Sequence, residues 1–448
     1  MSLPRYPSYK DSGVEWLGKV PGHWEVSSLK RSFQIVGGST PKSENEFYWD
    51  GDILWATPSD LSKRESLYLH KTLRTITAHG LASCGTTLVP MGSIILSTRA
   101  PIGSLAIAAA PMCTNQGCKS LVPAESADAS YFAYLLTVSS TELNIRGKGT
   151  TFLELSADEL GAFKTPSPPH AEQTQIAAFL DRETAKIDEL VAEQRRLMAL
   201  LKEKRQAVIS HAVTRGLNPH APLKPSGIEW LGDVPEHWDV CSIRRVVSEI
   251  EQGWSPECHS RLADDDEWGV LKAGCVNRGT YDEQENKALP EELVPAPEYE
   301  VCVGDVLMSR ASGSPELVGS TALVTSTRPK LMLSDKIFRL RFELVMEPGF
   351  FVAALNSRPL RSQIEQALSG GNGLANNLPQ SALLGFFLCV PSVLEQREIC
   401  AFLQAETTKL DTLTAEAQRA IDLLQERRTA LISAAVTGQI DVRDAVSA

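Results

Sequence analysis

The chain has 448 residues, 43% of them hydrophobic and 22% charged, which is typical of a soluble globular protein. This length exceeds one ordinary core and suits two to four domains. The longest apolar stretch, 105–110, is far too short to cross a bilayer, and the N-terminus has no apolar signal-peptide core, so we expect a cytoplasmic protein without a membrane partner. Nine cysteines without a Cys-x-x-Cys pair indicate neither a disulfide framework nor a zinc site.

The formal net charge of −11 is unevenly distributed. Segments 1–168, 169–218, 219–393 and 394–448 carry net charges of 0, +1, −9 and −3. A DNA-binding protein needs a basic face rather than a basic total, so this distribution does not exclude a nucleic-acid partner. We expect the chain alone to bind DNA weakly and a basic partner to complete the site.

Short blocks of sequence repeat along the chain. Residues 10–26 recur at 224–240 with 12 of 17 positions identical. Two further pairs of similar blocks are 172–190 with 395–413, and 203–214 with 426–437, whereas the long segments between the blocks barely align. The chain is therefore an internal duplication that keeps its connecting parts alike while its two middles diverge.

The first middle segment is predicted to be mixed α/β. Short β-rich runs lie at 51–60, 92–103 and 119–123, between Gly, Pro and Asn residues that break them. A helical run at 131–146 and a glycine-rich loop at 146–151 follow. A long helix is then predicted over 176–213, because apolar residues recur at spacings of three and four with no internal Pro or Gly before Gly216.

The second half repeats this order. It has β-rich runs at 269–276, 304–312 and 335–342, a helical run at 349–368 and a glycine-rich loop at 370–377. A second long helix follows, with Ser392 and Glu395 at capping-box spacing before it and Gly438 after it. The strings GSIILSTR and GDVLMSR occupy matching places, which indicates that both middles share one fold.

Seven-residue series of apolar side chains predict one seam on each long helix. We predict that the seam residues are Leu180, Ile187, Leu190, Leu197, Leu201 and Val208 in the first helix and Leu403, Leu410, Leu413, Leu424 and Leu431 in the second. A globular segment separates the helices, so antiparallel pairing as a coiled coil is the simplest closure. The alternative is that each helix only covers its own domain.

One motif carries a family resemblance. The pattern P-x3-EQ-x2-I-x2-FL occurs at Pro168 and again at Pro391, each time between a globular half and a long helix. In this arrangement the chain resembles the specificity (S) subunit of type I restriction-modification systems along essentially its full length. The second glycine-rich loop departs from the first, because it has amides where the first has Arg146 and Lys148.

The resemblance implies a division of the chain. It assigns 1–168 and 218–391 to two target-recognition domains, 169–217 to a first spacer helix, and 392–448 to a second spacer helix with a C-terminal tail. The fold expected is mixed α/β, with two long helices packed as an antiparallel coiled coil and an internal pseudo-two-fold duplication. Each domain would read one half of a bipartite site in the grooves of double-stranded DNA, and the helices would set the spacer length and dock methyltransferase subunits.

The same resemblance implies partners and cofactors. Two methyltransferase subunits and, through the complex, restriction subunits are the expected partners. No cofactor is expected on this chain, whereas S-adenosylmethionine would bind the methyltransferase subunit and ATP with Mg the restriction subunit.

The residues show no catalytic motif. Ser167-Pro168-Pro169-His170 lacks the aromatic residue of an adenine-methyltransferase Asn-Pro-Pro-aromatic tetrapeptide and reads as a helix entry. No GxxxxGK[ST] loop occurs, and Glu285-Asn286-Lys287 is a chance triplet in an acidic loop. His23 and His237 are expected to orient a turn against Trp24 and Trp238 rather than to bind metal. We therefore predict a protein that is not an enzyme.

Base reading needs Arg or Lys for guanine and Asn or Gln for adenine, with further Lys, Arg, Ser and Thr for phosphate. Such side chains gather in the predicted loops. The candidates are Lys63, Arg64, Arg99, Asn115, Gln116, Lys119, Arg146, Lys148, Thr150 and Thr151 in the first half, and Lys272, Asn277, Arg278, Arg310, Lys336, Asn372, Asn376 and Asn377 in the second.

Two other functions compete with a specificity subunit. A stand-alone restriction or methylation enzyme predicts activity in the pure chain, and a coiled-coil scaffold predicts no salt-sensitive binding of DNA by the assembled complex. The sequence does not identify the bases read, because they depend on a few loop side chains.

Overall fold

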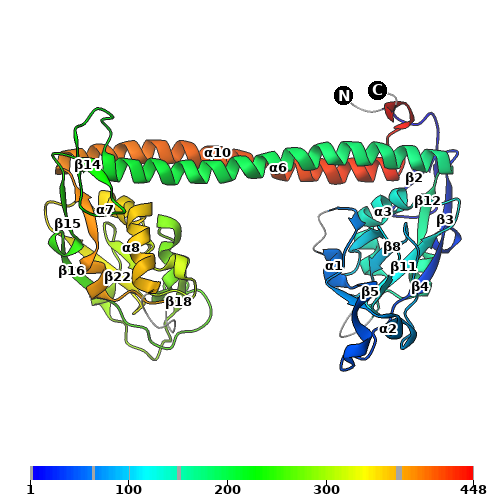
Figure 1. Ribbon diagram of the computed structural model, residues 1–448, viewed down its shortest axis with the longest axis horizontal. Helices are drawn as coiled ribbons and strands as arrows, with labels where there is room; N and C mark the ends of the chain where they lie inside the picture. The colour runs from blue at the N-terminus through cyan, green and yellow to red at the C-terminus, as the bar shows by residue number, and fades with distance from the viewer. Residues whose placement is uncertain (1–3, 63–65, 100, 149–152, 370–375, 447–448) are drawn as a thin grey trace. The chain divides into compact units, whose positions relative to one another are not determined.

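The computed structural model describes residues 4–62, 66–99, 101–148, 153–369 and 376–446. The chain divides into two compact units, the first made of Met1–Gln194 with Arg419–Ala448 and the second of Arg195–Gln418. Each unit holds a globular part of helices and short strands together with a part of each long helix, α6 and α10 (Figure 1). The predicted mixed α/β class is confirmed. No described helix is long and apolar enough to cross a membrane.

In the globular part of the first unit, the described residues form two sheets of three or more strands. The larger has the strand order β4-β11-β8-β9-β6 and is antiparallel except between β6 and β9, and the smaller has the order β10-β5-β7. Two ribbons, β1-β2 and β3-β12, complete the strands. The bounds are β1 Tyr9–Asp11, β2 Lys19–Pro21, β3 Glu25–Ser28, β4 Phe33–Gly37, β5 Trp49–Ala56, β6 Tyr68–Leu69, β7 Arg74–Ile76, β8 Ile94–Ser97, β9 Leu105–Ala108, β10 Met112–Thr114, β11 Cys118–Pro123 and β12 Lys164–Ser167.

Strand β8 is buried on both faces, which explains its continuous apolar sequence. Ile94 and Leu96 belong to the core that includes helix α3, while Ile95 belongs to the core shared with Ala56 and Met112 of the smaller sheet. The helices of this unit are α1 Pro58–Ser62, α2 Ala78–Ala82, α3 Ala129–Val138, α4 Ser140–Ile145 and α5 Ala157–Ala162, with short 3-10 helices at Leu29–Arg31, Glu46–Tyr48 and Arg443–Val446. The predicted runs at 92–103, 119–123 and 131–146 therefore supply β8, β11 and α3 with α4.

The second unit repeats the plan with fewer strands. A four-stranded sheet has the order β16-β22-β19-β20, a three-stranded sheet the order β18-β17-β21, and the ribbons are β13-β14 and β15-β23. Strand β19 places Val306 and Met308 in one core and Leu307 in another, as β8 does in the first unit. The bounds are β13 Leu223–Pro225, β14 Asp233–Pro235, β15 Asp239–Ser242, β16 Val247–Gln252, β17 Gly269–Leu271, β18 Asn286–Ala288, β19 Val306–Ser309, β20 Thr321–Leu323, β21 Leu331–Met332, β22 Ile337–Phe342 and β23 Phe387–Val390.

The described part of the second unit contains three short α-helices. They are α7 Pro348–Leu355, α8 Arg358–Ser369 and α9 Gln380–Gly385, with 3-10 helices at Ile243–Arg245, Ala273–Gly279, Pro297–Tyr299 and Pro315–Leu317. The predicted helical run at 349–368 thus forms α7 and α8. The prediction that the triplet Glu285-Asn286-Lys287 lies in a loop is wrong for its last two residues, because β18 begins at Asn286.

The two long helices are α6, His170–Arg215, and α10, Val393–Val436. Each ends just before a glycine with a positive φ of 73° or 75°, at Gly216 and Gly438, where a side chain would be strained. The start of α10 is capped as predicted, since the backbone N–H of Glu395 donates to the Ser392 hydroxyl at 3.3 Å.

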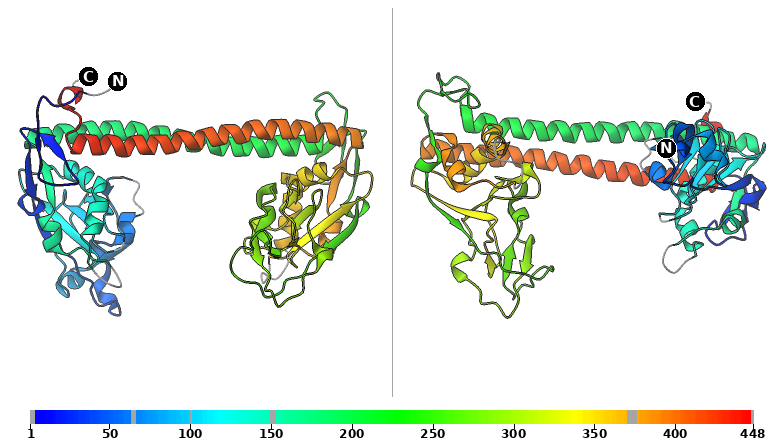
Figure 2. Two further views of the ribbon diagram at one scale, coloured as in Figure 1. Left: turned by 180° about the vertical axis from the view of Figure 1, so that it is seen from behind. Right: turned by 60° about the horizontal axis from the view of Figure 1, so that its bottom comes forward.

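Within each unit, the parts of α6 and α10 run side by side (Figure 2). In the first unit, Arg428 Nε lies 3.0 Å from Asp188 Oδ1. In the second, Arg205 Nε lies 3.3 Å from Asp411 Oδ1. Residues 176–180, near the start of α6, share the first unit's core with residues 432–436, at the end of α10. Residues 209–213, near the end of α6, share the second unit's core with residues 399–403, near the start of α10. The two helices therefore run in opposite directions in each unit.

The buried face of these helices corrects part of the predicted seam. Leu180, Ile187, Leu201, Leu403 and Leu410 are buried, and Val208, Leu424 and Leu431 are half-buried. Leu190, Leu197 and Leu413 are 44%, 43% and 46% exposed, so our prediction that they lie in the seam is wrong.

The interleaved seam positions follow the first series by four residues rather than by three. They are Thr184, Val191, Met198, Arg205 and Ala212 in α6 and Thr407, Thr414, Ile421, Arg428 and Ala435 in α10, all buried or half-buried. An offset of three residues and an offset of four residues between the two series both fit a seven-residue repeat. The buried second series contains threonines and arginines, whereas the exposed positions hold leucines. Apolar periodicity alone therefore favoured the exposed positions.

Candidate nucleic-acid interface

The same backbone frame surrounds the end of β8 in the first unit and the end of β19 in the second. In the first, the backbone N–H of Thr98 donates to Gly117 O at 2.9 Å, and Leu155 N–H donates to Thr98 O at 2.9 Å. In the second, Arg310 N–H donates to Lys336 O at 2.9 Å, and Leu378 N–H donates to Arg310 O at 2.7 Å. Three distant segments of each half therefore meet at one strand end.

The serine before Thr98 and the serine before Arg310 also make matching hydrogen bonds. The Ser97 hydroxyl donates to Arg99 O at 2.9 Å, and the Ser309 hydroxyl donates to Ala311 O at 3.3 Å. By this alignment Thr98 corresponds to Arg310. The likeness of GSIILSTR and GDVLMSR, seen in the sequence, marks this strand end in both units.

In the first unit, two predicted DNA-binding cations at this frame are paired with carboxylates. Arg99 Nη2 lies 3.2 Å from Glu154 Oε2, and Lys148 Nζ lies 2.6 Å from Glu159 Oε1. The backbones of Lys148 and Glu154 exchange two hydrogen bonds of 3.0 Å, which brings both pairs together. The hydrogen bond from Lys148 lowers the pKa of Glu159. The sequence prediction did not identify either glutamate.

The amide candidates of the first unit lie in the turn before β11. Asn115 Oδ1 accepts a hydrogen bond from the backbone N–H of Gly117 at 3.0 Å, and Gln116 accepts one from the Thr40 hydroxyl. Because Gly117 binds Thr98, this turn adjoins the end of β8. Lys119 lies one residue into β11, where it pairs with Gly37 of β4 and Leu96 of β8.

Arg146 lies apart from these ion pairs on an aromatic ring. Its guanidinium carbon is 5.4 Å from the centroid of the Phe163 ring, which itself stacks on Trp16. Four candidates of this half, Lys63, Arg64, Thr150 and Thr151, lie outside the described residues.

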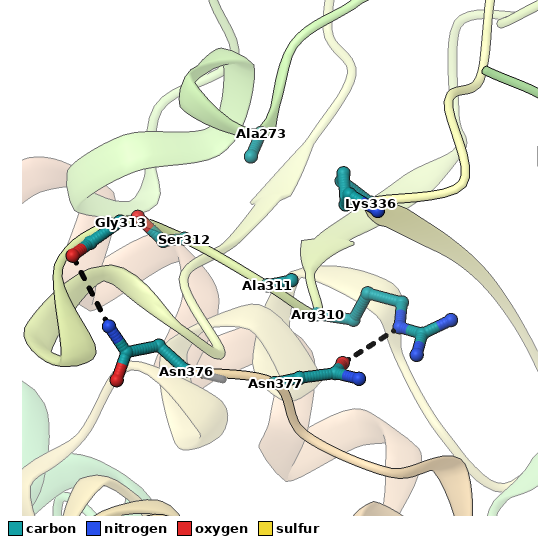
Figure 3. A pocket seen from close by; sticks show the side chains of 8 residues that line it. All are labelled: Ala273, Arg310, Ala311, Ser312, Gly313, Lys336, Asn376 and Asn377. Atoms are coloured by element: carbon teal, nitrogen blue, oxygen red, sulfur yellow. Dashed lines mark hydrogen bonds between the residues drawn. The ribbon is translucent and has the colours of Figure 1, made fainter. Parts of the chain in front are cut away.

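In the second unit, four predicted candidates line one open pocket of about 460 Å³ (Figure 3). They are Arg310, Lys336, Asn376 and Asn377, and they share the pocket with Ala273, Ala311, Ser312 and Gly313. Arg310 Nε donates to Asn377 Oδ1 at 3.0 Å, and Asn376 Nδ2 donates to Gly313 O at 3.2 Å. The structure therefore brings together side chains from segments that are 67 residues apart in the chain.

A second pocket of about 270 Å³ adjoins the first through Ala273 and Lys336 and includes Lys272. Lys272 Nζ is 3.7 Å from Glu285 Oε2, and Lys336 Nζ is 2.6 Å from Asp335 Oδ2. Burial alone would raise the pKa of Asp335, but hydrogen bonds from Lys336 and Ser255, with the charge of Arg310, leave it lowered.

The other candidates of the second unit are less informative. Asn277 lies in the 3-10 helix Ala273–Gly279 that follows the Lys272 pocket. Arg278 lies in the same helix, but its side chain is outside the described part of the chain, as is the whole of Asn372. The described residues contain no group of three or more His, Cys, Asp or Glu side chains that could hold a metal ion.

The repeated His-Trp strings contact the first turns of the long helices. His23 Nε2 is 2.8 Å from Glu172 Oε2, and His237 Nε2 is 3.1 Å from Glu395 Oε2. The string 167–170 is a helix entry, as predicted, because Pro169 O accepts the N–H of Glu172 at 2.9 Å.

The fold and site together define a mixed α/β protein that twice presents cationic and amide side chains at the end of a buried strand. Residues 21–196 match the family model of the type I restriction modification DNA specificity domain. The chain therefore contains a domain of that family and is related to type I specificity subunits, which confirms the resemblance seen in the sequence.

Two curated relatives illustrate this relationship. The chain is 36% identical over 190 residues to the MjaIX specificity subunit of Methanocaldococcus jannaschii, covering 42% of this chain and 43% of that protein. It is 32% identical over 242 residues to the EcoEI specificity subunit of Escherichia coli, covering 53% of this chain and 40% of that protein. These matches span less than half the length of either relative.

Two solved structures share the fold. One is a chain from a study of complex assembly and conformational transition of the type I R-M system, with a TM-score of 0.70 at 16% identity, covering 93% of this chain and 98% of that one. The other is the HsdS subunit of Thermoanaerobacter tengcongensis, with a TM-score of 0.52 at 16% identity, covering 94% and 98%.

Proposed function

We propose that this chain is the DNA sequence-recognition subunit of a type I restriction-modification complex, and that each unit reads one half of a bipartite site. The observation that supports this most is the recurrence of one backbone frame in both units, at Thr98 and at Arg310. Around each frame lie different side chains. A common frame with different polar groups is what two readers of different half-sites require.

In this proposal the chain itself is not catalytic. Methyl transfer would belong to methyltransferase subunits that bind S-adenosylmethionine, and cleavage to restriction subunits that use ATP and Mg. The target-recognition domains would comprise 1–168 and 218–391, and the complex would act in the cytoplasm.

We further propose that α6 and α10 form one antiparallel coiled coil that sets the spacing of the half-sites. The opposite chain directions and the ion pairs Asp188–Arg428 and Arg205–Asp411 support this pairing. The exposed Leu190, Leu197 and Leu413 then belong to the outer face of the helices, where methyltransferase subunits would dock.

The test is a methylation map. The chain is co-expressed with a type I methyltransferase subunit of its host genome in cells that lack other adenine methylation, and modified adenines are located by long-read sequencing. We expect one motif made of two specific half-sites with unspecified bases between them. A continuous motif, the absence of any motif from an active complex, or methyl transfer by the isolated chain would refute the proposal.

A further inference from the structure

Arg310 is held in a fixed position at the pocket of the second unit (Figure 3). Its backbone is hydrogen-bonded on both sides, to Lys336 and to Leu378. Its side chain donates from Nε to Asn377 Oδ1 at 3.0 Å and lies with its guanidinium carbon 5.3 Å from the centroid of the Phe338 ring. An arginine restrained in this way loses little conformational freedom when it binds a ligand.

The partner of Arg310 is an amide, whereas the neighbouring cations have carboxylate partners. Lys336 is paired with Asp335, and Lys272 lies near Glu285. In the first unit, Glu154 occupies the place of Asn377, because the isolated bridge Arg99↔Glu154 corresponds to Ala311↔Asn377. Asn377 thus orients Arg310 without neutralising its charge.

The terminal nitrogens of Arg310 remain available. Only Nε is used by Asn377, and no hydrogen bond or ion pair involves Nη1 or Nη2 among the residues that the structure describes. These two nitrogens form a planar fork of donors next to an open pocket of about 460 Å³.

The chemistry of that fork selects one base. Guanine presents two acceptors, N7 and O6, in the major groove, and a guanidinium binds both at once. Adenine presents one acceptor and an amino donor there, so a fork of donors meets a like group. A phosphate would accept from the same fork, but it would give no base selectivity.

We propose that Arg310 reads a guanine of the second half-site through Nη1 and Nη2, and that Asn377 is the positioning residue that aims it. The proposal rests on the function proposed above and adds the residue and the base. It predicts that the second half-site contains a G·C pair whose recognition depends on Arg310.

The experiment uses the chain in complex with its methyltransferase subunits. Binding is measured for duplexes in which each base pair of the mapped second half-site is replaced in turn. For the native complex, replacing the guanine pair by A·T should weaken binding by about 5- to 150-fold. In Arg310→Ala the fold-change in binding caused by this replacement should fall towards one, while the fold-changes at the other base pairs should stay as in the native complex.

Three further variants separate the parts of the argument. Arg310→Lys keeps the charge but not the fork, so it should lose most of the discrimination. Asn377→Ala should reduce it in part, and Asn377→Glu should reduce binding of the native site because it pairs Arg310 with a carboxylate. Arg341→Ala is the matched control, since Arg341 is an exposed arginine of β22, in the sheet that contains β19, and its Nε lies 3.4 Å from Glu249 Oε2.

The outcomes are distinct. The proposal would be overturned if Arg310→Ala left the fold-change unchanged at every base pair. It would also be overturned if the variant lost discrimination at an A·T pair of the native half-site instead of at a G·C pair. A uniform loss for all sequences with a salt slope reduced by about one would show a phosphate contact and would also overturn it. If Arg310→Ala unfolds, as judged by its melting temperature, Arg310→Lys decides the question. A native complex without a second half-site would instead refute the proposed function.

Discussion

The indole Nε1 of Trp24 donates a hydrogen bond to Glu172 Oε1 at 3.0 Å. The Tyr6 hydroxyl donates to the same oxygen at 2.7 Å, and Gly438 lies beside the Trp24 ring, where a Cβ atom would come within 3.0 Å of Trp24 Cζ3. These contacts join the repeated blocks 10–26, 172–190 and 426–437 in one place, since each block supplies or adjoins one partner. In the second unit Trp238 likewise adjoins Gly216, and His237 contacts Glu395. The repeated sequence is therefore the joint between a globular part and the long helices.

Removing the carboxylate of this joint should destabilise the first unit. In Glu172→Ala, the buried Trp24 and Tyr6 lose their acceptor, and each unsatisfied group costs about 1–3 kcal/mol. Calorimetry should show a lower melting temperature. Glu395→Ala is the matched control and should have a smaller effect, because Trp238 Nε1 is buried without a hydrogen-bond partner among the described residues. Equal losses in both variants would contradict this account.

The corrected seam predicts opposite behaviour for two adjacent residues. Val191 is 7% exposed and Leu190 is 44% exposed. Val191→Asp would bury an unpaired carboxylate at a cost of several kcal/mol and should lower the melting temperature sharply. Leu190→Asp should leave it nearly unchanged but weaken co-purification with methyltransferase subunits, if the outer face is their docking surface. A stable Val191→Asp protein would contradict the seam described here.

The sequence predicts elements whose cause is local and fails where partners are distant. Strand β8 was predictable because four successive apolar or small residues, Ile94–Ser97, are bounded by loop residues. The hydrogen bond between Arg310 and Asn377 was not predictable, because the fold brings together two side chains that are 67 residues apart in the sequence. The same holds for Arg99 and Glu154, whose ion pair changes what that arginine offers to DNA. Apolar periodicity predicts both long helices, but it does not distinguish the exposed leucines from the buried second series of the seam.

The Arg99–Glu154 pair predicts a variant that binds DNA more tightly. In Glu154→Gln the side chain keeps its size but loses its negative charge, so the charge of Arg99 is no longer offset by a carboxylate 3.2 Å away and acts fully on a DNA phosphate. We expect a higher affinity of the complex for all sequences and a salt slope steeper by about one. Glu125→Gln, an exposed residue of the same unit, changes the net charge equally and should not alter the slope. A loss of affinity confined to the first half-site would show that Glu154 itself reads a base.

The long helices should determine the gap between the two half-sites. Duplicating Met198–Leu201 in α6 and the equivalent Ile421–Leu424 in α10 lengthens each helix by about one turn, or about 6 Å. The seam survives only approximately, because four residues are not a whole seven-residue repeat: beyond the insertion, residues of the first series move into second-series positions, whereas residues of the second series move one position past the first series. At about 3.4 Å per base pair, the preferred gap should grow by about one or two base pairs. The half-site sequences should not change, because the residues around Thr98 and Arg310 that would read them are untouched, and they serve as the internal control. A methylation map of the double insertion decides the matter: an active complex with an unchanged gap, or with altered half-sites, would show that α6 and α10 do not set the spacing.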